Sequence, residues 1–190
     1  MAEIKAIISD FDGTLVDTFE ANFLAYEQAF AEIGYSLTRE MYRACFGLRY
    51  DKFIEQIGLE KNEDTRKVRD LKAQYYPQHF EHLKVNKTLV EFIRAFHADG
   101  GKTAIASTAR RENLMAALKS IGATELFDVI LAGDVVEHGK PNPEIYLKAL
   151  EMLQVQAEDA ICFEDTEVGV EAAKAAGVSV VKIDKNYYGN

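Results

Sequence analysis

The sequence has a deficit of positive charge. Among its 190 residues, 22 are Lys or Arg and 31 are Asp or Glu, which gives a formal net charge of −9. Nucleic acids and anionic membranes attract basic surfaces, so we expect neither kind of partner. An anionic ligand would need a local attraction instead, from a metal ion, a few Lys or Arg side chains, or helix N-termini.

Cysteine is also scarce, and the two present, Cys45 and Cys162, are far apart and show no metal-type spacing. We interpret each as a buried, reduced thiol. The sequence shows no signal peptide and no apolar run long enough to span a membrane, and it has no internal repeat or low-complexity segment. Together these absences favour a cytoplasmic protein, which we expect to be monomeric.

Short apolar runs recur along the chain and predict buried strands. The first run covers residues 4–9. Four more cover residues 102–107, 128–132, 160–164 and 178–183. From about residue 85 onward these runs alternate with helical patterns of apolar residues, which is typical of a parallel sheet with right-handed helical crossovers. We therefore predict an α/β fold with a parallel, Rossmann-like sheet.

The segment after the first run has a different pattern. Its apolar residues keep helical spacing, as Phe19, Phe23 and Phe30 do, and we find no strand-like alternation between residues 18 and 84. We predict a core domain made of residues 1–16 and 85–190, with an inserted α-helical cap domain at residues 17–84.

Acidic residues stand at two of the predicted strand ends. Asp10 and Asp12 follow the first run, and Glu164 and Asp165 end the run at residues 160–164. Ligands of open parallel sheets bind at the carboxyl ends of the strands. Clustered carboxylates repel one another unless a positive group lies among them, and Mg²⁺ prefers such oxygen ligands. We therefore expect a Mg²⁺ site formed by these two strand ends.

Two further strand ends or loops carry groups suited to phosphate. Ser107 and Thr108 follow the run at residues 102–107, where hydroxyl and backbone N–H groups can hold phosphate oxygens. Lys140 lies in a loop between glycine and proline, ahead of a predicted helix. A lysine near a carboxylate and a phosphate would neutralise the charge that develops on the phosphoryl group.

Taken together, these motifs resemble those of the haloacid dehalogenase superfamily of phosphohydrolases. The motif D-x-D-G-T of that family is matched by residues 10–14, its Ser/Thr motif by Ser107, its lysine by Lys140, and its acidic motif by Glu164 and Asp165. The resemblance covers nearly the whole chain. It is most similar to the subgroup with a helical cap that contains β-phosphoglucomutase and phosphoglycolate phosphatase.

The resemblance implies roles for the catalytic residues. Asp10 would be the nucleophile that forms an aspartyl-phosphate. Asp12 would protonate the leaving oxygen and then deprotonate the attacking water. Ser107, Thr108 and Lys140 would hold the oxygens of the transferring phosphoryl group.

The resemblance also implies a set of metal ligands. Mg²⁺ would be bound by the side chain of Asp10, the backbone carbonyl of Asp12 and Asp165. Glu164 would bind it directly or through water. The ion would let Asp10 approach a phosphate dianion of like charge.

Residues of the cap, with one neighbour of the second motif, are expected to select the substrate. The candidates are Asn22, Arg43, Arg49, Lys52 and Arg110. Arg49 resembles a cap arginine that meets a second phosphate in sugar-phosphate members, and Arg110 matches a basic position with the same use. We expect Asn22, Arg49 and Arg110 to bind the substrate. His79 and His82, which lack an acidic third ligand in this interpretation, are read as surface residues.

The sequence leaves three functions open. The first is a Mg²⁺-dependent phosphatase acting on a small phosphomonoester such as a sugar phosphate, phosphoglycolate or a nucleotide. The second is a phosphosugar mutase, which the resemblance disfavours because Asn22 stands where β-phosphoglucomutase has a cap-hinge histidine. The third is a non-catalytic phosphate-binding protein on the same fold, which the complete set of motif residues disfavours.

Overall fold

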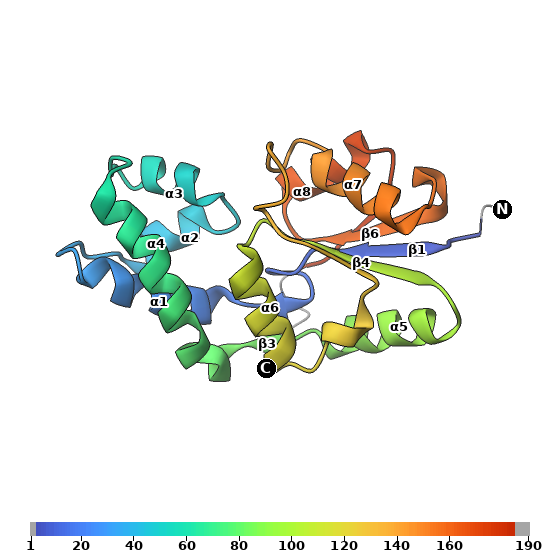
Figure 1. The fold of residues 1–190 in the computed structure, drawn as a ribbon, viewed down its shortest axis with the longest axis horizontal. Coiled ribbons are helices and arrows are strands. Elements are labelled where there is room, and N and C mark those ends of the chain that lie inside the picture. Colours follow the sequence, from blue (N-terminus) through green and yellow to red (C-terminus); the bar gives the residue numbers. More distant parts are fainter. Residues whose placement is uncertain (1–2, 185–190) are drawn as a thin grey trace. The chain divides into compact units, whose positions relative to one another are not determined.

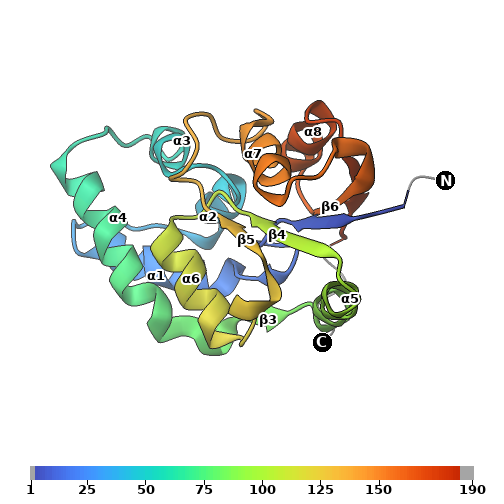
Figure 2. The ribbon, with the colours of Figure 1, turned by 45° about the vertical axis from the view of Figure 1, so that its right-hand side comes forward.

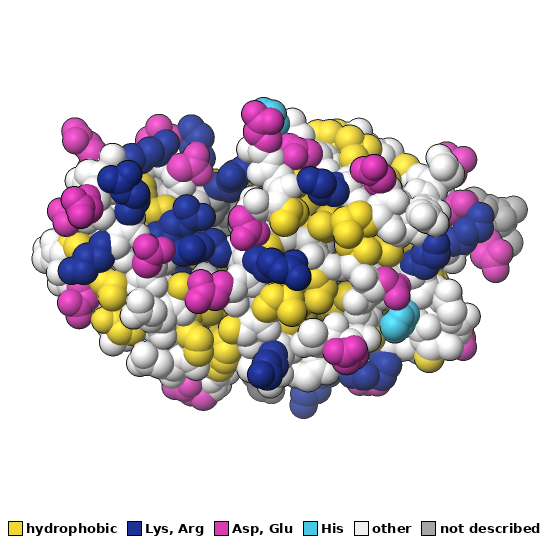
Figure 3. Space-filling model, in the orientation of Figure 1, with side chains coloured by type: hydrophobic (Ala, Val, Ile, Leu, Met, Phe, Trp, Pro, Cys, Tyr) yellow, Lys and Arg dark blue, Asp and Glu magenta, His cyan; other side chains and the backbone are white. Residues whose placement is uncertain are grey.

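The structure is a computed structural model, and it describes residues 3–184 of the chain. The chain divides into two compact units (Figure 1). One unit is Thr18–Leu83, and the other contains the described residues before and after it. No helix in the described part of the chain is both long and apolar enough to cross a membrane. Acidic and basic side chains are interspersed over much of the face shown in Figure 3.

The larger unit is built on a five-stranded parallel sheet with the strand order β5-β4-β1-β6-β7. Its strands are β1 (Ala6–Ser9), β4 (Lys102–Ala106), β5 (Val129–Leu131), β6 (Ala160–Glu164) and β7 (Ser179–Lys182). Each of the five predicted apolar runs contains one of these strands. The prediction of a parallel α/β sheet is therefore confirmed.

Helices cover both faces of this sheet (Figures 1 and 2). On one side lie α7 (Glu144–Leu153) and α8 (Glu167–Ala175), and on the other lie α5 (Lys87–Ala98) and α6 (Arg111–Ser120). Two single turns of 3₁₀ helix, η2 (Thr124–Leu126) and η3 (Ala157–Asp159), precede β5 and β6. Because both faces are covered, all four residues of β1 are buried, which explains its unbroken apolar run.

The centre of the sheet determines where a ligand can bind. β1 pairs with β4 on one side and with β6 on the other, both in parallel. The strand order therefore changes direction at β1, and the loops that follow these three strands emerge at the same edge. Open α/β sheets bind ligands at such a point.

Two very short strands stand where the chain leaves and re-enters the sheet unit. β2 (Val16–Asp17) pairs antiparallel with β3 (Lys84–Val85). Asn86 continues this link, because its backbone N–H donates to the carbonyl oxygen of Leu15 at 2.9 Å. The sequence analysis found no strand near residue 84, since a strand of two residues is too short to produce an alternating pattern.

The second unit, described on its own, is helical. It contains α1 (Phe19–Ala31), α2 (Arg39–Cys45), α3 (Tyr50–Gln56), α4 (Glu63–Tyr75) and the 3₁₀ helix η1 (Tyr76–His82). Its core consists largely of aromatic rings, among them Phe23, Phe30, Tyr42 and Phe53. The helical segment between β1 and β3 is consistent with a cap inserted into the sheet unit.

Two details of the expected packing can be compared with the structure. Phe92 has helical spacing with the buried residues Leu89 and Ile93 of α5, yet it is 52% exposed. It lies at the edge of the buried face, with its ring centroid 6.0 Å from that of Phe163. Cys45 and Cys162 are both buried and free, as expected.

Candidate active site

Three carboxylates from two strand ends lie together at the centre of the sheet edge. Asp10 follows β1, Glu164 ends β6, and Asp165 comes next; all three are buried. They offer ligand oxygens that all lie within 4.8 Å of one another. The two strand ends are joined by a hydrogen bond, because the backbone N–H of Asp10 donates to the carbonyl oxygen of Phe163 at 2.9 Å.

Gly13 and Thr14 explain the local turn after β1. Gly13 has φ +93°, a conformation that L side chains rarely adopt. A Cβ atom at this position would also lie 2.3 Å from Oδ2 of Asp165. Thr14 donates its hydroxyl to Oδ1 of Asp165 at 3.3 Å. The D-G-T sequence therefore allows the loop after β1 to approach and orient the carboxylate after β6.

Lys140 places a positive charge among these carboxylates. Its Nζ atom donates to Oδ1 of Asp10 at 2.7 Å and to the carbonyl oxygen of Ala106 at 2.9 Å. It also donates to Oε1 of Glu164. The Lys140 side chain is only 4% exposed, so these bonds form away from bulk water.

The buried charges shift the pKa values of this pair. Burial raises the pKa of Asp10 well above its ordinary value, the attraction of Lys140 opposes this, and Glu164, Asp165 and Asp12 raise it further. Burial alone would lower the pKa of Lys140, but Asp10 and Glu164 outweigh that effect and raise it. Lys140 is thus held as a cation beside several carboxylates.

The composition of this cluster fits a magnesium ion. A single lysine faces the three carboxylates of Asp10, Glu164 and Asp165, so one more cation is needed to balance them. The available ligands are hard oxygens, without imidazole or thiolate, and Mg²⁺ prefers such ligands.

Glu164 uses both of its oxygens for hydrogen bonds within the protein. Oε1 accepts from Lys140 and from the hydroxyl of Tyr146, the latter at 2.6 Å. Oε2 accepts from the backbone N–H of Asp165 and from the hydroxyl of Thr166, each at 3.2 Å. The approach of α8 is close, since a Cβ on Gly169 would lie 2.0 Å from Oε1 of Glu164. Glu164 is therefore held in one orientation.

Tyr146 is a member of this network that the sequence analysis did not find. It lies on α7, its side chain is fully buried, and its ring centroid is 5.2 Å from Nζ of Lys140. Burial raises the pKa of its hydroxyl, with smaller contributions from Cys162 and Glu164. Its position beside the apolar face of the predicted helix could have indicated this role. A tyrosine at such a position is expected to be buried, and a buried tyrosine hydroxyl usually has a hydrogen-bond partner.

Ser107 and Asp12 meet on the other side of β1. The hydroxyl of Ser107 donates to Oδ2 of Asp12 at 3.2 Å and accepts from the backbone N–H of Ala109 at 3.0 Å. Thr108 follows Ser107 at the same strand end, and its backbone packs so closely on the next loop that a Cβ on Gly133 would lie 2.2 Å from its carbonyl oxygen. The predicted phosphate-binding motif thus stands beside the D-x-D motif.

The loop that carries Lys140 is fixed by the first residue of α7. Glu144 accepts hydrogen bonds from the backbone N–H groups of Glu137 at 2.9 Å and of His138 at 2.8 Å. These bonds lower the pKa of Glu144. Asn142 precedes Pro143, the N-cap residue of α7, and its side-chain oxygen accepts from the N–H of Glu144 at 3.0 Å.

The predicted substrate-binding residues are divided between the two units. Asn22 is buried on α1, and Arg49 directly precedes α3, with its Nε atom 4.0 Å from a carboxylate oxygen of Asp51. Both belong to the helical unit. Arg110 directly precedes α6 in the sheet unit, three residues after Ser107. Their roles stay predictions.

The other two cap candidates make local interactions. The guanidinium of Arg43 lies 5.3 Å from the ring centroid of Phe19. The ammonium of Lys52 donates to a carboxylate oxygen of Glu55 at 2.8 Å. In both interactions the partner residue belongs to the helical unit.

Comparison with known proteins gives a consistent result. The sequence matches the model of the haloacid dehalogenase-like hydrolase family over residues 7–183. It is 32% identical over 181 residues to a phosphorylated carbohydrates phosphatase of Thermotoga maritima, covering 92% of this chain and 82% of that protein. It is 35% identical over 200 residues to the protein CbbY of Rhodobacter capsulatus, covering 97% of this chain and 87% of that one.

The fold is also similar to a solved structure with a bound ligand. The crystal structure of a CbbY mutant from Rhodobacter sphaeroides, in complex with xylulose-(1,5)bisphosphate, superposes with a TM-score of 0.85. The two sequences are 28% identical, and the match covers 98% of this chain and 90% of the other.

Proposed function

Because this chain belongs to the haloacid dehalogenase-like hydrolase family, close to its CbbY, β-phosphoglucomutase and phosphoglycolate phosphatase subgroup, we propose that it is a Mg²⁺-dependent phosphatase of a small sugar phosphate. The reaction would pass through an aspartyl-phosphate on Asp10. The observation that carries this proposal is the buried pair of Asp10 and Lys140, set beside the carboxylate of Asp165.

In the first half of the reaction Asp10 is the nucleophile. Lys140 holds Oδ1 of Asp10, which leaves Oδ2 to form the bond to phosphorus. As that bond forms, the bond from phosphorus to the ester oxygen breaks, and Asp12 gives its proton to the leaving alcohol. Ser107, which donates to Asp12, keeps that carboxyl group at the edge of the site.

In the second half water cleaves the acyl phosphate. Asp12, now a carboxylate, takes a proton from water while the water oxygen bonds to phosphorus. The bond between phosphorus and Oδ2 of Asp10 breaks, inorganic phosphate leaves, and Asp10 is restored as a carboxylate.

The remaining polar groups balance charge and hold geometry. Mg²⁺, held by the carboxylates of Asp10 and Asp165 and the carbonyl of Asp12, would supply the positive charge that lets Asp10 meet a phosphate dianion. In the transition state Lys140 would exchange one of its three protein acceptors for a phosphoryl oxygen. Ser107 would turn its hydroxyl from Asp12 to a phosphoryl oxygen, and Thr108 would hold another. The complete set speaks against a non-catalytic phosphate-binding protein.

Glu164 supports this centre through Lys140. Its two oxygens are already engaged by protein donors, including Lys140, Tyr146 and Thr166. We assign it the role of orienting the lysine, with any link to the metal through water. This choice refines the expected ligand set, in which Glu164 binds the ion directly or through water.

The substrate class rests on the relatives. One relative is a phosphatase of phosphorylated carbohydrates, and another protein of this fold binds xylulose-(1,5)bisphosphate. A sugar phosphate is accordingly our first choice, and a second phosphate would suit Arg49 and Arg110. Asn22 would contribute an amide to the leaving group.

A phosphosugar mutase is the alternative, and Asn22 argues against it. A mutase must return its phosphoryl group to the sugar and requires a proton relay that an amide, which does not titrate near neutral pH, cannot provide. We therefore propose prompt release of inorganic phosphate without a bisphosphate activator.

The test is a panel of sugar phosphates, phosphoglycolate and nucleotides, assayed with Mg²⁺ and with EDTA, with Asp10→Asn as the blank. We expect release of inorganic phosphate from one sugar phosphate, in Mg²⁺ only and from the wild-type chain only. With β-glucose 1-phosphate and a trace of glucose 1,6-bisphosphate, faster formation of glucose 6-phosphate than of inorganic phosphate would overturn hydrolysis in favour of the mutase.

A further inference from the structure

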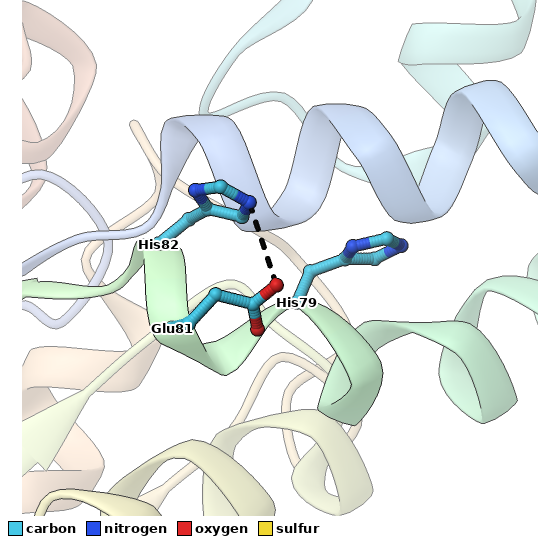
Figure 4. Close-up of side chains that lie close together, drawn as sticks. All are labelled: His79, Glu81 and His82. Carbon is cyan, nitrogen blue, oxygen red and sulfur yellow. Dashed lines mark ion pairs between the residues drawn. The ribbon is translucent and has the colours of Figure 1, made fainter.

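A second group of metal-ligating side chains lies in the helical unit. His79, Glu81 and His82 belong to η1 and offer ligand atoms that all lie within 4.8 Å of one another (Figure 4). Among the described residues, this group and the carboxylates of the candidate active site are the two groups with this property. The sequence interpretation treated the histidines as lacking an acidic third ligand, whereas the structure places Glu81 beside them.

The local backbone brings the three side chains together. A 3₁₀ helix has about three residues per turn, so side chains at positions i and i+3, here His79 and His82, emerge on the same side. His79 departs from helical geometry, with φ −116° and ψ 17°, and so kinks η1. Nε2 of His82 lies 3.5 Å from Oε1 of Glu81, and the two imidazole centroids are 6.5 Å apart.

The ligand atoms of this group are not committed to other bonds. Nε2 of His79 is buried and has no hydrogen-bond partner among the described residues. The side chain of Glu81 is 65% exposed and that of His82 is 41% exposed, so both can change rotamer. In Figure 4, Nε2 of His79 lies on the far side of its ring from Glu81, so Nδ1 is the nitrogen of His79 that faces the other two side chains.

The other two histidines of the chain form a useful contrast. His97 and His138 each lie 3.3 Å from a single carboxylate, that of Asp128 and that of Glu144. Both carboxylates already accept backbone N–H groups, from Thr103 in the first case and from the Lys140 loop in the second. Within residues 3–184 neither pair belongs to a group of three metal-ligating side chains, and both pairs serve local structure.

We propose that His79, Glu81 and His82 bind one divalent transition-metal ion, with Zn²⁺ as the best fit. Two imidazoles and one carboxylate form a recognised Zn²⁺ ligand set, which leaves a fourth position for water. Mg²⁺ is excluded because it prefers oxygen ligands. The ligand atoms of a tetrahedral Zn²⁺ site are about 3.4 Å apart, whereas those of the three side chains lie within 4.8 Å of one another. The exposed side chains of Glu81 and His82 can close this difference by rotating toward His79.

A bound ion would hold the side chains of His79, Glu81 and His82 together at the end of η1. It would thereby stabilise the folded helical unit. An ion that binds only the folded chain raises its free energy of unfolding, and the gain grows with the logarithm of the ratio of ion concentration to dissociation constant. This inference is independent of the proposed phosphatase activity, because none of the three residues belongs to the catalytic set.

The test measures Zn²⁺ binding to the full chain without a polyhistidine tag, by equilibrium dialysis in excess Mg²⁺. We expect one Zn²⁺ per chain, a rise in Tm on adding Zn²⁺, and a Co²⁺ absorption spectrum with imidazole ligands. His79→Gln and His82→Gln should each lower Zn²⁺ affinity by about tenfold or more. The matched control His138→Gln should bind Zn²⁺ as the wild type does.

A second variant distinguishes Zn²⁺ bound at the histidine cluster from Zn²⁺ bound at the carboxylates of the sheet unit. In an Asp165→Ala background the Zn²⁺ attributed to the histidine cluster should remain. The proposal is overturned if the bound Zn²⁺ disappears with Asp165→Ala, or if His79→Gln and His82→Gln bind it as tightly as the wild type. Circular dichroism of the variants, compared with that of the wild type, establishes that their helices are intact.

Discussion

The ammonium of Lys140 lies 2.7 Å from Oδ1 of Asp10 and donates also to Glu164, with almost no exposure to solvent. One lysine from the loop before α7 thus joins the strand ends of β1 and β6. Because the pair is buried, its geometry is strongly constrained and its charges are little screened by salt.

Replacing Lys140 tests this arrangement. Lys140→Met keeps most of the side-chain volume but removes the charge, so we expect kcat/KM to fall by about 10²–10³-fold, the usual cost of losing one donor to a developing charge. Steady-state kinetics with the best substrate of the panel measures the loss. Lys148→Met is the control, since Lys148 donates to the carbonyl of Val135 within the same unit. A near-normal kcat/KM for the Lys140 variant would exclude its role at the phosphoryl group.

Tyr146 is predicted to act by positioning Glu164 and Lys140. Tyr146→Phe removes one buried hydroxyl, which on ordinary hydrogen-bond energies corresponds to about a tenfold effect. We expect kcat to fall with little change in KM, because the hydroxyl contacts no substrate. Tyr35→Phe is the matched control, since it removes a hydroxyl that donates to the carbonyl of Ile57 at 3.0 Å. If both variants lose the same amount of Tm and kcat is unchanged, Tyr146 contributes to packing only and does not position Glu164 or Lys140.

The metal requirement is predicted to depend on Asp165. Asp165→Ala removes a carboxylate that Gly13 and Thr14 hold toward the cluster, so a much higher Mg²⁺ concentration should be needed for half-maximal activity. EDTA should stop the wild-type reaction, and Mg²⁺ should restore it. Asp159→Ala, which removes a carboxylate paired with Lys5 at the surface, should leave the Mg²⁺ dependence unchanged. Full activity in EDTA would contradict the metal assignment.

Glu144 gives a prediction for the dependence of stability on pH. Its pKa is lowered in the folded state by the backbone N–H groups of Glu137 and His138, so its stabilising effect is present above the ordinary glutamate pKa. That effect is lost as the pH falls through the lowered value. Glu144→Gln should therefore lower Tm near neutral pH, and the difference from wild type should shrink in acid. A difference in Tm that does not change with pH would contradict the ionic origin of this contact.

Much of the sheet unit was predictable because its strands are buried on both faces. Such strands give continuous apolar runs, and the residue after each run lies at a predictable edge of the sheet. The pattern of apolar runs alone therefore predicts that Asp10, Ser107 and Asp165 lie at one edge of the sheet. Lys140 required the family resemblance, since an isolated lysine in a loop is usually solvated.

The contacts between side chains were less predictable. The hydrogen bond from Tyr146 to Glu164 depends on how α7 is rotated against β6, which the apolar pattern fixes only to within a residue. The proximity of Glu81 to His79 and His82 was not predictable, because only the two histidines share a helical spacing and η1 is kinked at His79. Asn22 and Arg49, the predicted substrate residues, lie in the helical unit. The sequence of that unit predicts its aromatic core, but it does not identify which side chains bind a ligand.

The central claim is that Asp10 carries the phosphoryl group during turnover. Its most direct test is rapid acid quenching of the enzyme during turnover of the best substrate in Mg²⁺, followed by peptide mass spectrometry. We predict one added phosphoryl group on the peptide that contains Asp10, sensitive to hydroxylamine and absent from Asp10→Asn, which should also lose turnover. Turnover with the phosphoryl group on a different residue, or a fully active Asp10→Asn enzyme, would contradict the account.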